Sequence, residues 1–448
     1  MSKSPFTLKA KSQLINRVLG RKTHTAEADH DSAEHRLTAP QARSRLPESL
    51  TRFDRFPGYE KMLVSKATAD RFGLRNPFFI SHDGVAGAVS QIGGAEYLNF
   101  SSYNYLGLNG HPVVNQAAQE AMARYGTSAS ASRLVAGERP IQRALESALA
   151  ALYGVEDCVV FVSGHATNVS TIGYLFGPRD LVIHDSLIHN SVLEGIKLSG
   201  AARRSFPHND TWALDAILAE IREQFERVLI VVEGHYSMDG DIPDLPTLID
   251  IKRRHQAFLM VDEAHSLGVL GATGRGIHEH YGLAGTDVDI WMGTLSKTLA
   301  ACGGYIAGPA ALIDHLKYAA PGFVYSVGIS PPLAAAALAA LQLMQAEPER
   351  VRRLQHNGQQ MLHLAREAGL DTGSSAGFSI VPLITGSSLK ATRLSNRLFD
   401  LGVNVQPIVY PAVEEKGARL RLFLSAEHDE SQFHKLLNAV AGVSRFIS

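Results

Sequence analysis

The sequence predicts an α/β protein with a large domain built on a mainly parallel sheet, followed by a smaller α+β domain. The middle of the chain alternates short apolar runs with segments of helical periodicity, and the runs lack the polar alternation of half-exposed strands. From about residue 335 the pattern changes to two helical segments and then three short strand-like runs. The apolar runs are 158–162, 181–184, 228–233, 258–263 and 288–293.

The predicted helices carry recognisable start and stop signals. In the segment 139–154, Pro140 suits the first helical turn, apolar residues recur on one face from Ile141 to Leu152, and Gly154 ends the helix. Further helices are expected at 111–126, 211–225 and 245–256.

The composition excludes several classes of protein. The 448 residues carry a formal net charge of −1 without a block of like charge in the body of the chain, which argues against a nucleic-acid-binding protein. Cys158 and Cys302 lie in no Cys/His cluster, so neither a disulfide framework nor a metal site is predicted, and Cys158 is expected to be buried. No run reaches the about 18 apolar residues of a transmembrane segment, and the nearest approach, 333–344, is expected to be a packed helix. We therefore expect a cytoplasmic protein.

The first part of the chain is expected to be a polar arm, residues 1–50. Its first 22 residues hold six basic and no acidic side chains. A mobile, solvated tail is favoured, and the alternative is a basic amphipathic helix that acts as an organelle transit peptide or a docking segment. The further boundaries are expected at 51–110 for an N-terminal segment, 111–334 for the large domain and 335–448 for the small C-terminal domain.

Polar residues gather where the predicted strands end. Because the carboxyl ends of parallel strands meet at one edge of a sheet, these residues should share one rim. A single His or Asp at a strand end is more often a capping group than a catalyst, but five successive polar strand ends are hard to explain in that way. The segments are "SGHATN" (163–168), "DSLIHNS" (185–191), "GHYSMDGD" (234–241), "DEAHS" (262–266) and "GTLSK" (293–297).

Part of this rim suits a phosphate group. Gly164 lies at a strand-to-helix turn, where the backbone can approach a ligand and the free N–H groups of a helix start favour an anion. Thr294 and Ser296 offer hydroxyl contacts to the same group.

The neighbouring residues suit an aromatic ring. Asp262 follows an apolar run directly, so it is expected to be partly buried, where a carboxylate needs a cationic partner such as a protonated pyridine nitrogen. His189 is expected to stack on a flat ring, and Lys297 to form a Schiff base. A ring with a protonated nitrogen, an aldehyde that reacts with a lysine and a phosphate group are together the features of pyridoxal phosphate. The alternative for Lys297 is a surface lysine that anchors a turn. The small residues from Ala300 to Gly304 are expected to keep that turn close-packed.

Longer motifs run from about residue 95 to the C-terminus. They are "NFSSYNYLGL", "ASRLVAGERPIQRALE", "FVSGHATN", "HDSLIHNS", "FPHND", "VEGHYSMDGD", "VDEAHSLGVLGATGRG", "GTLSK", "SPP" and "ARLRLFLSAEH". With these motifs the chain resembles the α-oxoamine synthases, a group of pyridoxal-phosphate enzymes that includes 8-amino-7-oxononanoate synthase, glycine C-acetyltransferase, 5-aminolevulinate synthase and serine palmitoyltransferase. The resemblance implies the aminotransferase-like fold of fold type I.

The resemblance also implies roles for individual residues. Lys297 would carry pyridoxal phosphate as a Schiff base, Asp262 would pair with its pyridine nitrogen, and His189 would stack on its ring. His265 would bond the ring hydroxyl, with Ser237 nearby; Lys297, His189, Asp262 and His265 form the implied catalytic set. The residues implied to hold the phosphate are Ser163, Gly164, His165, Thr294 and Ser296.

On the substrate side, the resemblance implies that Arg421 binds the carboxylate of an amino acid, with Tyr103 and Asn104 close to the substrate. Arg419 is the less favoured choice and is expected to be a surface residue on an alternating strand. Two positions depart from the family. Tyr103 replaces an asparagine of many members, a variant similar to serine palmitoyltransferases and polyketide-pathway synthases, and His165 replaces an aromatic residue. Both departures leave the exact substrate open.

The implied reaction is a decarboxylative condensation of serine, alanine or glycine with an acyl thioester of coenzyme A or of an acyl carrier protein. The alternatives are an aminotransferase or lyase on the same fold, and a non-catalytic scaffold, which the presence of both Lys297 and Asp262 disfavours. The family is dimeric with active sites at the subunit interface, so the segments 103–107 and 325–332 are expected to reach the partner's site.

Overall fold

This computed structural model describes residues 46–444, and the chain divides into two compact units, Met1–Phe79 and Ile80–Ser448. Most of the predicted N-terminal arm, with its basic stretch, lies outside the described residues. The described part of the first unit holds two short 3-10 turns, Glu48–Leu50 and Phe53–Arg55, and helix α2 (Pro57–Arg71), which begins with a proline in its first turn.

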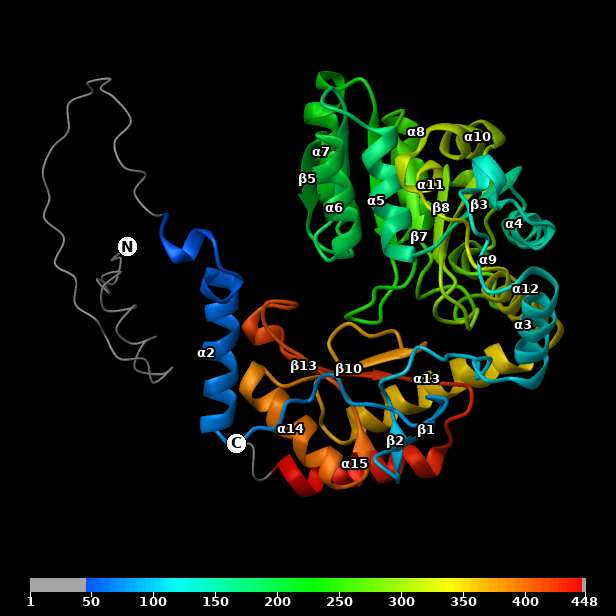
Figure 1. Ribbon diagram of the computed structural model, residues 1–448. Helices are drawn as coiled ribbons and strands as arrows, with labels where there is room; N and C mark the ends of the chain where they lie inside the picture. The colour runs from blue at the N-terminus through cyan, green and yellow to red at the C-terminus, as the bar shows by residue number, and fades with distance from the viewer. Residues whose placement is uncertain (1–45, 445–448) are drawn as a thin grey trace, which may run out of the picture. The chain divides into compact units, whose positions relative to one another are not determined.

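The second unit contains a seven-stranded sheet (Figure 1). Strands β4 to β8 pair in parallel, whereas β9 runs antiparallel to both of its neighbours. The mainly parallel sheet and the five predicted strands are thereby confirmed. The strand order is β3 (Asp157–Phe161), β9 (Gly304–Gly308), β8 (Ile290–Thr294), β7 (Phe258–Asp262), β6 (Val228–Glu233), β4 (Leu181–Asp185) and β5 (Ala202–Phe206).

Both faces of this sheet are buried. On β6, Val228, Ile230 and Val232 pack into one apolar cluster, while Leu229 and Val231 pack into a second. The first cluster also holds side chains from α4 (Pro140–Tyr153), α7 (Thr211–Ile221), α8 (Leu245–Arg254) and α12 (Pro331–Ala346). The second holds side chains from α5 (Gly164–Leu175), α6 (Asn190–Ser199) and α10 (Ala310–Ala319). Alternate side chains therefore supply two cores, which explains why the strands read as continuous apolar runs.

Two strands of this sheet were not among the predicted ones. Strand β5 reads "ARRSF" and is an edge strand with exposed central residues, so it lacks an apolar run. Strand β9 reads "GYIAG" and begins and ends with glycine, a residue that ordinarily weakens a strand.

The predicted helices are present. Helix α4 ends at Gly154, whose φ of 67° is left-handed and suits glycine. The alanine-rich run lies within α12, and α3 spans Pro112–Tyr125. None of the described helices has the length and apolarity needed to cross a membrane. Shorter elements are a π-helical turn at Arg133–Gly137, η4 (Arg222–Gln224), α9 (Ile277–Tyr281), η5 (Gly285–Asp287), α11 (Pro321–Val324) and η6 (Glu415–Gly417).

The C-terminal part alternates helices with short strands. Its sheet has the order β10-β13-β12 and is antiparallel. A further sheet pairs β1 with β2, and β2 with β11 in parallel, so residues near 95 join the C-terminal part. The elements are β1 (Val89–Ile92), β2 (Ala95–Asn99), α13 (Glu349–Glu367), β10 (Ile380–Ile384), α14 (Ser388–Asp400), β11 (Val403–Asn404), β12 (Pro407–Ile408), β13 (Arg419–Phe423) and α15 (Glu430–Ser444).

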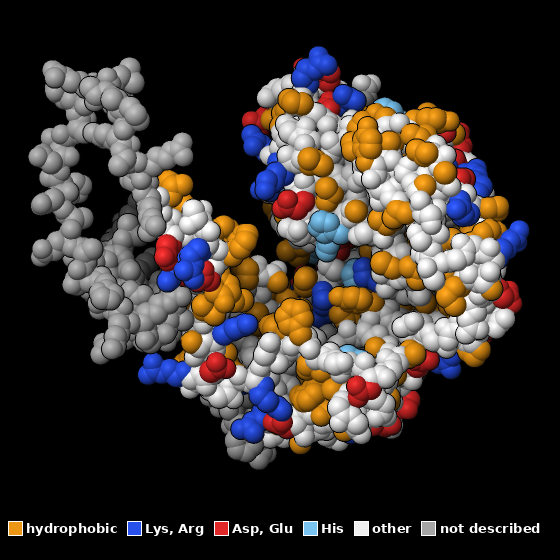
Figure 2. Space-filling view, in the orientation of Figure 1, with side chains coloured by type: hydrophobic (Ala, Val, Ile, Leu, Met, Phe, Trp, Pro, Cys, Tyr) orange, Lys and Arg blue, Asp and Glu red, His pale blue; other side chains and the backbone are white. Residues whose placement is uncertain are grey.

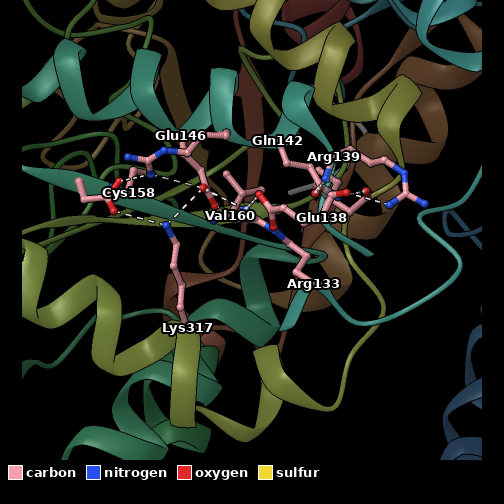
Figure 3. A network of polar contacts seen from close by, with 11 residues as sticks. Arg133, Glu138, Arg139, Gln142, Glu146, Cys158, Val160 and Lys317 are labelled. Atoms are coloured by element: carbon pink, nitrogen blue, oxygen red, sulfur yellow. Dashed lines mark hydrogen bonds and ion pairs between the residues drawn. The ribbon is translucent and has the colours of Figure 1, made fainter. Parts of the chain in front are cut away.

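A buried carboxylate ties the helices to the sheet on the β3 side (Figure 3). The Glu146 side chain on α4 is fully buried and accepts hydrogen bonds from the Arg133 guanidinium and from the Val160 backbone N–H at 2.9 Å. Lys317 on α10 places its Nζ 3.4 Å from the same carboxylate. Glu146 thus joins α4, β3, α10 and the turn that carries Arg133.

We predict that Glu146→Gln lowers the free energy of unfolding by about 3 kcal/mol, because it removes the buried counter-charge of the Arg133 cation and leaves that cation paired with the exposed Glu138. Urea denaturation measures this change. The control is Glu226→Gln, which removes an exposed pair with Arg179 at 2.7 Å and should cost less than about 1 kcal/mol. Equal losses in the two variants would contradict the assignment of Glu146 as a buried anchor.

Candidate active site

The predicted rim lies at the carboxyl edge of the sheet, where several strand ends surround one cavity. Seven residues singled out from the sequence line it, together with others that were not. The lining is Gly164, His165, Asn168, His189, Ser191, Glu233, Asp262, Ala264, His265, Met292, Thr294 and Lys297. Figure 2 shows a hollow in this face of the second unit, with histidine and basic side chains inside it.

The start of α5 forms one wall of the cavity. Ser163 caps the helix by accepting a hydrogen bond from the Ala166 N–H at 3.4 Å. A Cβ added to Gly164 would lie 2.9 Å from the Thr294 hydroxyl oxygen, and one added to Gly304 would lie 2.6 Å from the Gly164 Cα. The start of α5 therefore packs so closely against the end of β8 and the start of β9 that Gly164 and Gly304 leave no room for a side chain. The turn after Lys297 is close-packed at Gly304, as the sequence suggested.

Hydroxyl groups line the same wall. The Thr294 hydroxyl donates to the Gly303 carbonyl at 3.0 Å and accepts from the Ser296 N–H at 3.2 Å. Ser296 is exposed and lines a second cavity, and its hydroxyl oxygen lies 3.2 Å from that of Thr294. His165 is exposed at the first turn of α5. Free N–H groups of a helix start, with a hydroxyl beside them, suit a phosphate.

Asp262 is a buried carboxylate with neutral partners. Its Oδ2 accepts from the Asn168 side-chain amide at 2.9 Å, and its Oδ1 accepts from the Ala264 N–H at 3.0 Å. Among residues 46–444 it forms no ion pair. The cationic partner that a buried carboxylate requires is thus left to a bound group.

Lys297 carries the amine of the site. Burial lowers the pKa of Lys297 to about 8, an effect that Arg421 reinforces and that the carboxylates of Asp262 and Glu233 oppose. Its Nζ lies 5.5 Å from the centre of the Tyr103 ring. A sizeable fraction of the amine is therefore neutral near pH 7.5, which makes it a nucleophile and a base.

Lys297 also borders a second cavity of about 280 Å³. Tyr103 and Asn104 line this cavity, with Ser296 at its edge. The Asn104 side chain is engaged in its own turn, where its Oδ1 accepts from the Asn109 N–H at 3.0 Å. The amine therefore stands where two cavities meet, one of them lined by the histidines and Asp262 and the other by Tyr103.

The two histidines have fixed orientations. His265 is buried, its Nδ1 lies 2.6 Å from the Tyr105 hydroxyl oxygen, and burial holds the pKa of His265 well below its usual range. It is therefore neutral at pH 7. His189 caps α6, and its Nδ1 lies 2.7 Å from the Ser191 hydroxyl oxygen, which sets the ring at the wall of the cavity.

Ser237 and Arg421 meet beside the cavity. Ser237 is buried, donates its N–H to Glu233 Oε2 at 3.0 Å and accepts from Arg421 Nη1 at 2.8 Å through its carbonyl. The expectation that Arg419 lies on the surface is wrong: it is 8% exposed and donates to Asp239 Oδ1 at 2.7 Å. Residues two apart on a strand share a face, so both arginines of β13 contact the same turn, 236–241.

Sequence reasoning missed three residues of the site. Asn168 holds Asp262, and Tyr105 holds His265; each lies inside one of the family motifs, three and one residues from a predicted site residue respectively. Glu233 ends the strand next to Asp262, and burial, with Asp262 beside it, raises the pKa of Glu233 to about 8. Its Oε1 has no protein partner in the described chain.

The residues present fit the pyridoxal phosphate that the resemblance implies. The cavity offers a helix start and a hydroxyl for the phosphate, a buried carboxylate without a cation for the pyridine nitrogen, and an amine for the aldehyde. The imidazole of His189 at the cavity wall suits the flat pyridine ring, so each functional part of this cofactor has a matching group.

Comparisons with known proteins agree with this site. A family model described as "Aminotransferase class I and II" matches residues 95–440. The chain is 42% identical to an 8-amino-7-oxononanoate synthase of Symbiobacterium thermophilum over 80% of this chain and 90% of that protein, and 41% identical to one of Methylococcus capsulatus over 78% and 90%. The structure of Sphingomonas wittichii serine palmitoyltransferase matches with a TM-score of 0.83 and 28% identity, over 87% of this chain and 98% of that chain.

A second solved structure, titled as serine palmitoyltransferase with a pyridoxal-phosphate internal aldimine, matches with the same TM-score of 0.83, at 27% identity and with the same coverage. The chain therefore belongs to the aminotransferase class I and II family and, within it, to the α-oxoamine synthases.

We predict that the amine of Lys297 in the cofactor-free protein reacts with acetic anhydride with a pH midpoint near 8, against about 10.4 for an ordinary lysine. Only the neutral amine is acylated, so the rate rises with pH as the proton leaves. Competitive labelling followed by mass spectrometry of the Lys297 peptide measures the midpoint, with Lys297→Arg as the blank. A midpoint above 10 would show that burial does not control this amine.

Proposed function

We propose that this protein joins an amino acid to an acyl thioester, with release of carbon dioxide and a free thiol, in a site that holds pyridoxal phosphate. One observation carries the proposal: the half-buried amine of Lys297 and the buried carboxylate of Asp262, which forms no ion pair among residues 46–444, line the same cavity. The names of the relatives, 8-amino-7-oxononanoate synthase and serine palmitoyltransferase, support the same reaction class.

The residues that would hold the cofactor follow from the cavity. The N–H groups at Gly164 and His165, with the capping Ser163 and the Thr294 and Ser296 hydroxyls, would hold the phosphate. Asp262 would hold the pyridine nitrogen in its protonated form, His265 and Ser237 would bond the ring hydroxyl, and His189 would stack on the ring. When bound, pyridoxal phosphate supplies an electron sink that stabilises negative charge on the α carbon of the amino acid.

Lys297 acts as the base in this proposal. Arg421 binds the substrate carboxylate, and the Lys297 amine removes the proton from the α carbon. A carbon–carbon bond then forms between the α carbon and the thioester carbonyl carbon, and the carbon–sulfur bond breaks, so that the thiolate leaves and takes a proton. The α-carboxylate departs as carbon dioxide, and a proton returns to the α carbon, which gives an α-amino ketone.

The electrostatics of the site support these roles. A base is most effective when its pKa lies near the working pH, and the pKa of about 8 for Lys297 meets this condition. The buried His265 stays neutral, so it would add no positive charge beside the ring hydroxyl. The cavity beside Tyr103 and Asn104 would receive the acyl thioester, which approaches Lys297 from the other side.

Both cysteines are free thiols, which supports a reducing compartment, and we place the protein in the cytoplasm on this ground.

The amino acid is serine, alanine or glycine, and the thioester is carried by coenzyme A or by an acyl carrier protein. Because Tyr103 stands at the substrate side of the amine, we expect it to contribute to this choice.

We predict that the purified protein with pyridoxal phosphate releases thiol and carbon dioxide in equal amounts from at least one pairing of these three amino acids with matched coenzyme A and carrier-protein thioesters. Lys297→Ala should lower turnover by about 10³-fold or more, because it removes both the cofactor anchor and the base. A thiol reagent and trapped ¹⁴C-labelled carbon dioxide measure the two products.

Other outcomes would reassign the protein. Formation of a keto acid without thiol release would make it an aminotransferase. A protein that shows no visible absorption band with pyridoxal phosphate, and no product, would be a scaffold that retains the fold.

We also propose that two copies of the chain assemble with their sites at the interface. The segments 131–137 and 321–330 pack against each other, with the Gly328 N–H donating to the Ala131 carbonyl at 3.1 Å. They expose large apolar side chains: Leu134, Val135, Tyr325 and Val327, of which Val135 is 81% and Tyr325 87% exposed. Exposed apolar groups gathered in this way are typical of a protein interface.

We predict that sedimentation equilibrium gives twice the 48.4-kDa mass of the chain. Val135→Glu should shift the mass toward a monomer, since it places a charge in the apolar contact. Tyr318→Glu, at a residue that is 71% exposed on α10, is the matched control and should leave the mass unchanged. A monomeric wild-type protein would contradict the shared-site proposal.

A further inference from the structure

The motif "FPHND" (206–210) has no part in the function proposed above, yet its histidine is held by two carboxylates. His208 places Nδ1 2.9 Å from Asp185 Oδ1 and Nε2 2.8 Å from Asp241 Oδ2. Both ring nitrogens face an acceptor, so both must donate, and the ring is an imidazolium. Burial lowers the pKa of His208, but its bonds to the two carboxylates outweigh burial and raise it to about 10.

Asp185 connects His208 to the turn between β4 and α6, which contains His189. Asp185 ends β4 and is fully buried. Its carboxylate also accepts from the Leu187 N–H and from the Asn209 N–H, each at 2.8 Å. The turn between β4 and α6 is therefore fixed to the turn that carries His208.

Asp241 connects the same histidine to the turn 236–241. The Asp241 carbonyl accepts from the Tyr236 N–H at 2.9 Å, which closes this turn. Its carboxylate also accepts from the Asn209 side-chain amide at 3.1 Å. The edge of the His208 ring meets the Tyr236 ring with 4.5 Å between ring centres.

The two arginines of β13 hold this turn from its other side. Arg421 Nη1 donates to the Ser237 carbonyl at 2.8 Å, and Arg419 Nη1 donates to the Met238 carbonyl at 3.0 Å and to Asp239. The turn therefore lies between a cation on the β5 side and two cations from β13. A shift of the turn would displace Ser237 and the guanidinium of Arg421 together.

We propose that His208 is a positioning residue for the amino-acid side of the active site: by bridging Asp185 and Asp241 it fixes the turn 236–241, against which Arg421 is oriented. This inference rests on the proposed function, in which Arg421 binds the substrate carboxylate. His208 acts through the turn and does not touch the substrate. Its loss should therefore weaken the binding of the amino acid more than that of the thioester.

The test compares His208→Gln with a matched control, His255→Gln. His255 Nε2 also bonds a carboxylate, Asp215 Oδ1, at 2.7 Å. It follows α8 and precedes β7, so it lies at the opposite, amino edge of the sheet. The control removes a partly buried His–Asp contact without touching the turn 236–241.

We predict that His208→Gln raises the KM for the amino acid by about tenfold or more, as expected for the loss of a charged hydrogen bond. The KM for the thioester should change by less than about twofold. His255→Gln should leave both values unchanged. Hydrogen–deuterium exchange of the peptide that spans 234–241 provides a readout without turnover, and it should speed up in His208→Gln alone.

Asp241→Asn provides a second variant if His208→Gln does not fold. It should give the same selective rise in KM, and the double variant should be no worse than His208→Gln alone, since both changes break one bridge. An unchanged amino-acid KM, an equal rise for both substrates, or the same effect in His255→Gln would overturn the inference. The proposed function is tested separately, because it fails only if the wild-type protein releases no thiol and carbon dioxide.

Discussion

Burial of both faces of the seven-stranded sheet is the constraint on which the rest of this structure depends. Every side chain of β6, from Val228 to Glu233, is buried, so on such an inner strand a polar group is tolerated only near the strand end, in contrast to the exposed edge strand β5. That places Asp262 and Lys297 at one edge, after neighbouring strands. Within residues 46–444 Asp262 forms no ion pair, and burial keeps the amine of Lys297 partly neutral; the proposed cationic, aldehyde-bearing cofactor would satisfy both groups.

Charges also organise the loops around that edge. The turn 236–241 lies between His208 and the arginines of β13, and it thereby joins the seven-stranded sheet to the C-terminal sheet. Each contact places a charged group against a buried or half-buried partner, where a hydrogen bond to a charge contributes more than a neutral one. In the proposed function, the substrate side of the site is therefore assembled from two sheets, whereas the cofactor side is built on one.

Much of this was predictable because the signals are local. The five apolar runs, the glycine stop of α4, and the polar strand ends that hold Asp262 and Lys297 all lie within a few residues of the feature that they predict. Strands β5 and β9 were not predictable in this way, since an exposed edge strand and a glycine-flanked strand carry no apolar run. Arg419 was misplaced because alternation on β13 suggested an exposed face, and the turn that covers that face comes from 180 residues earlier.

The sequence by itself determined the fold class, the lysine and the carboxylate, because hydrophobic periodicity and motif spacing are properties of neighbouring residues. Only the tertiary structure decided that Glu233 stands next to Asp262, that Tyr105 fixes His265, and that His208 bridges Asp185 and Asp241. These contacts join residues from separate strands and loops, and their distances and burial, which set the pKa of each group, exist only once the sheet has formed.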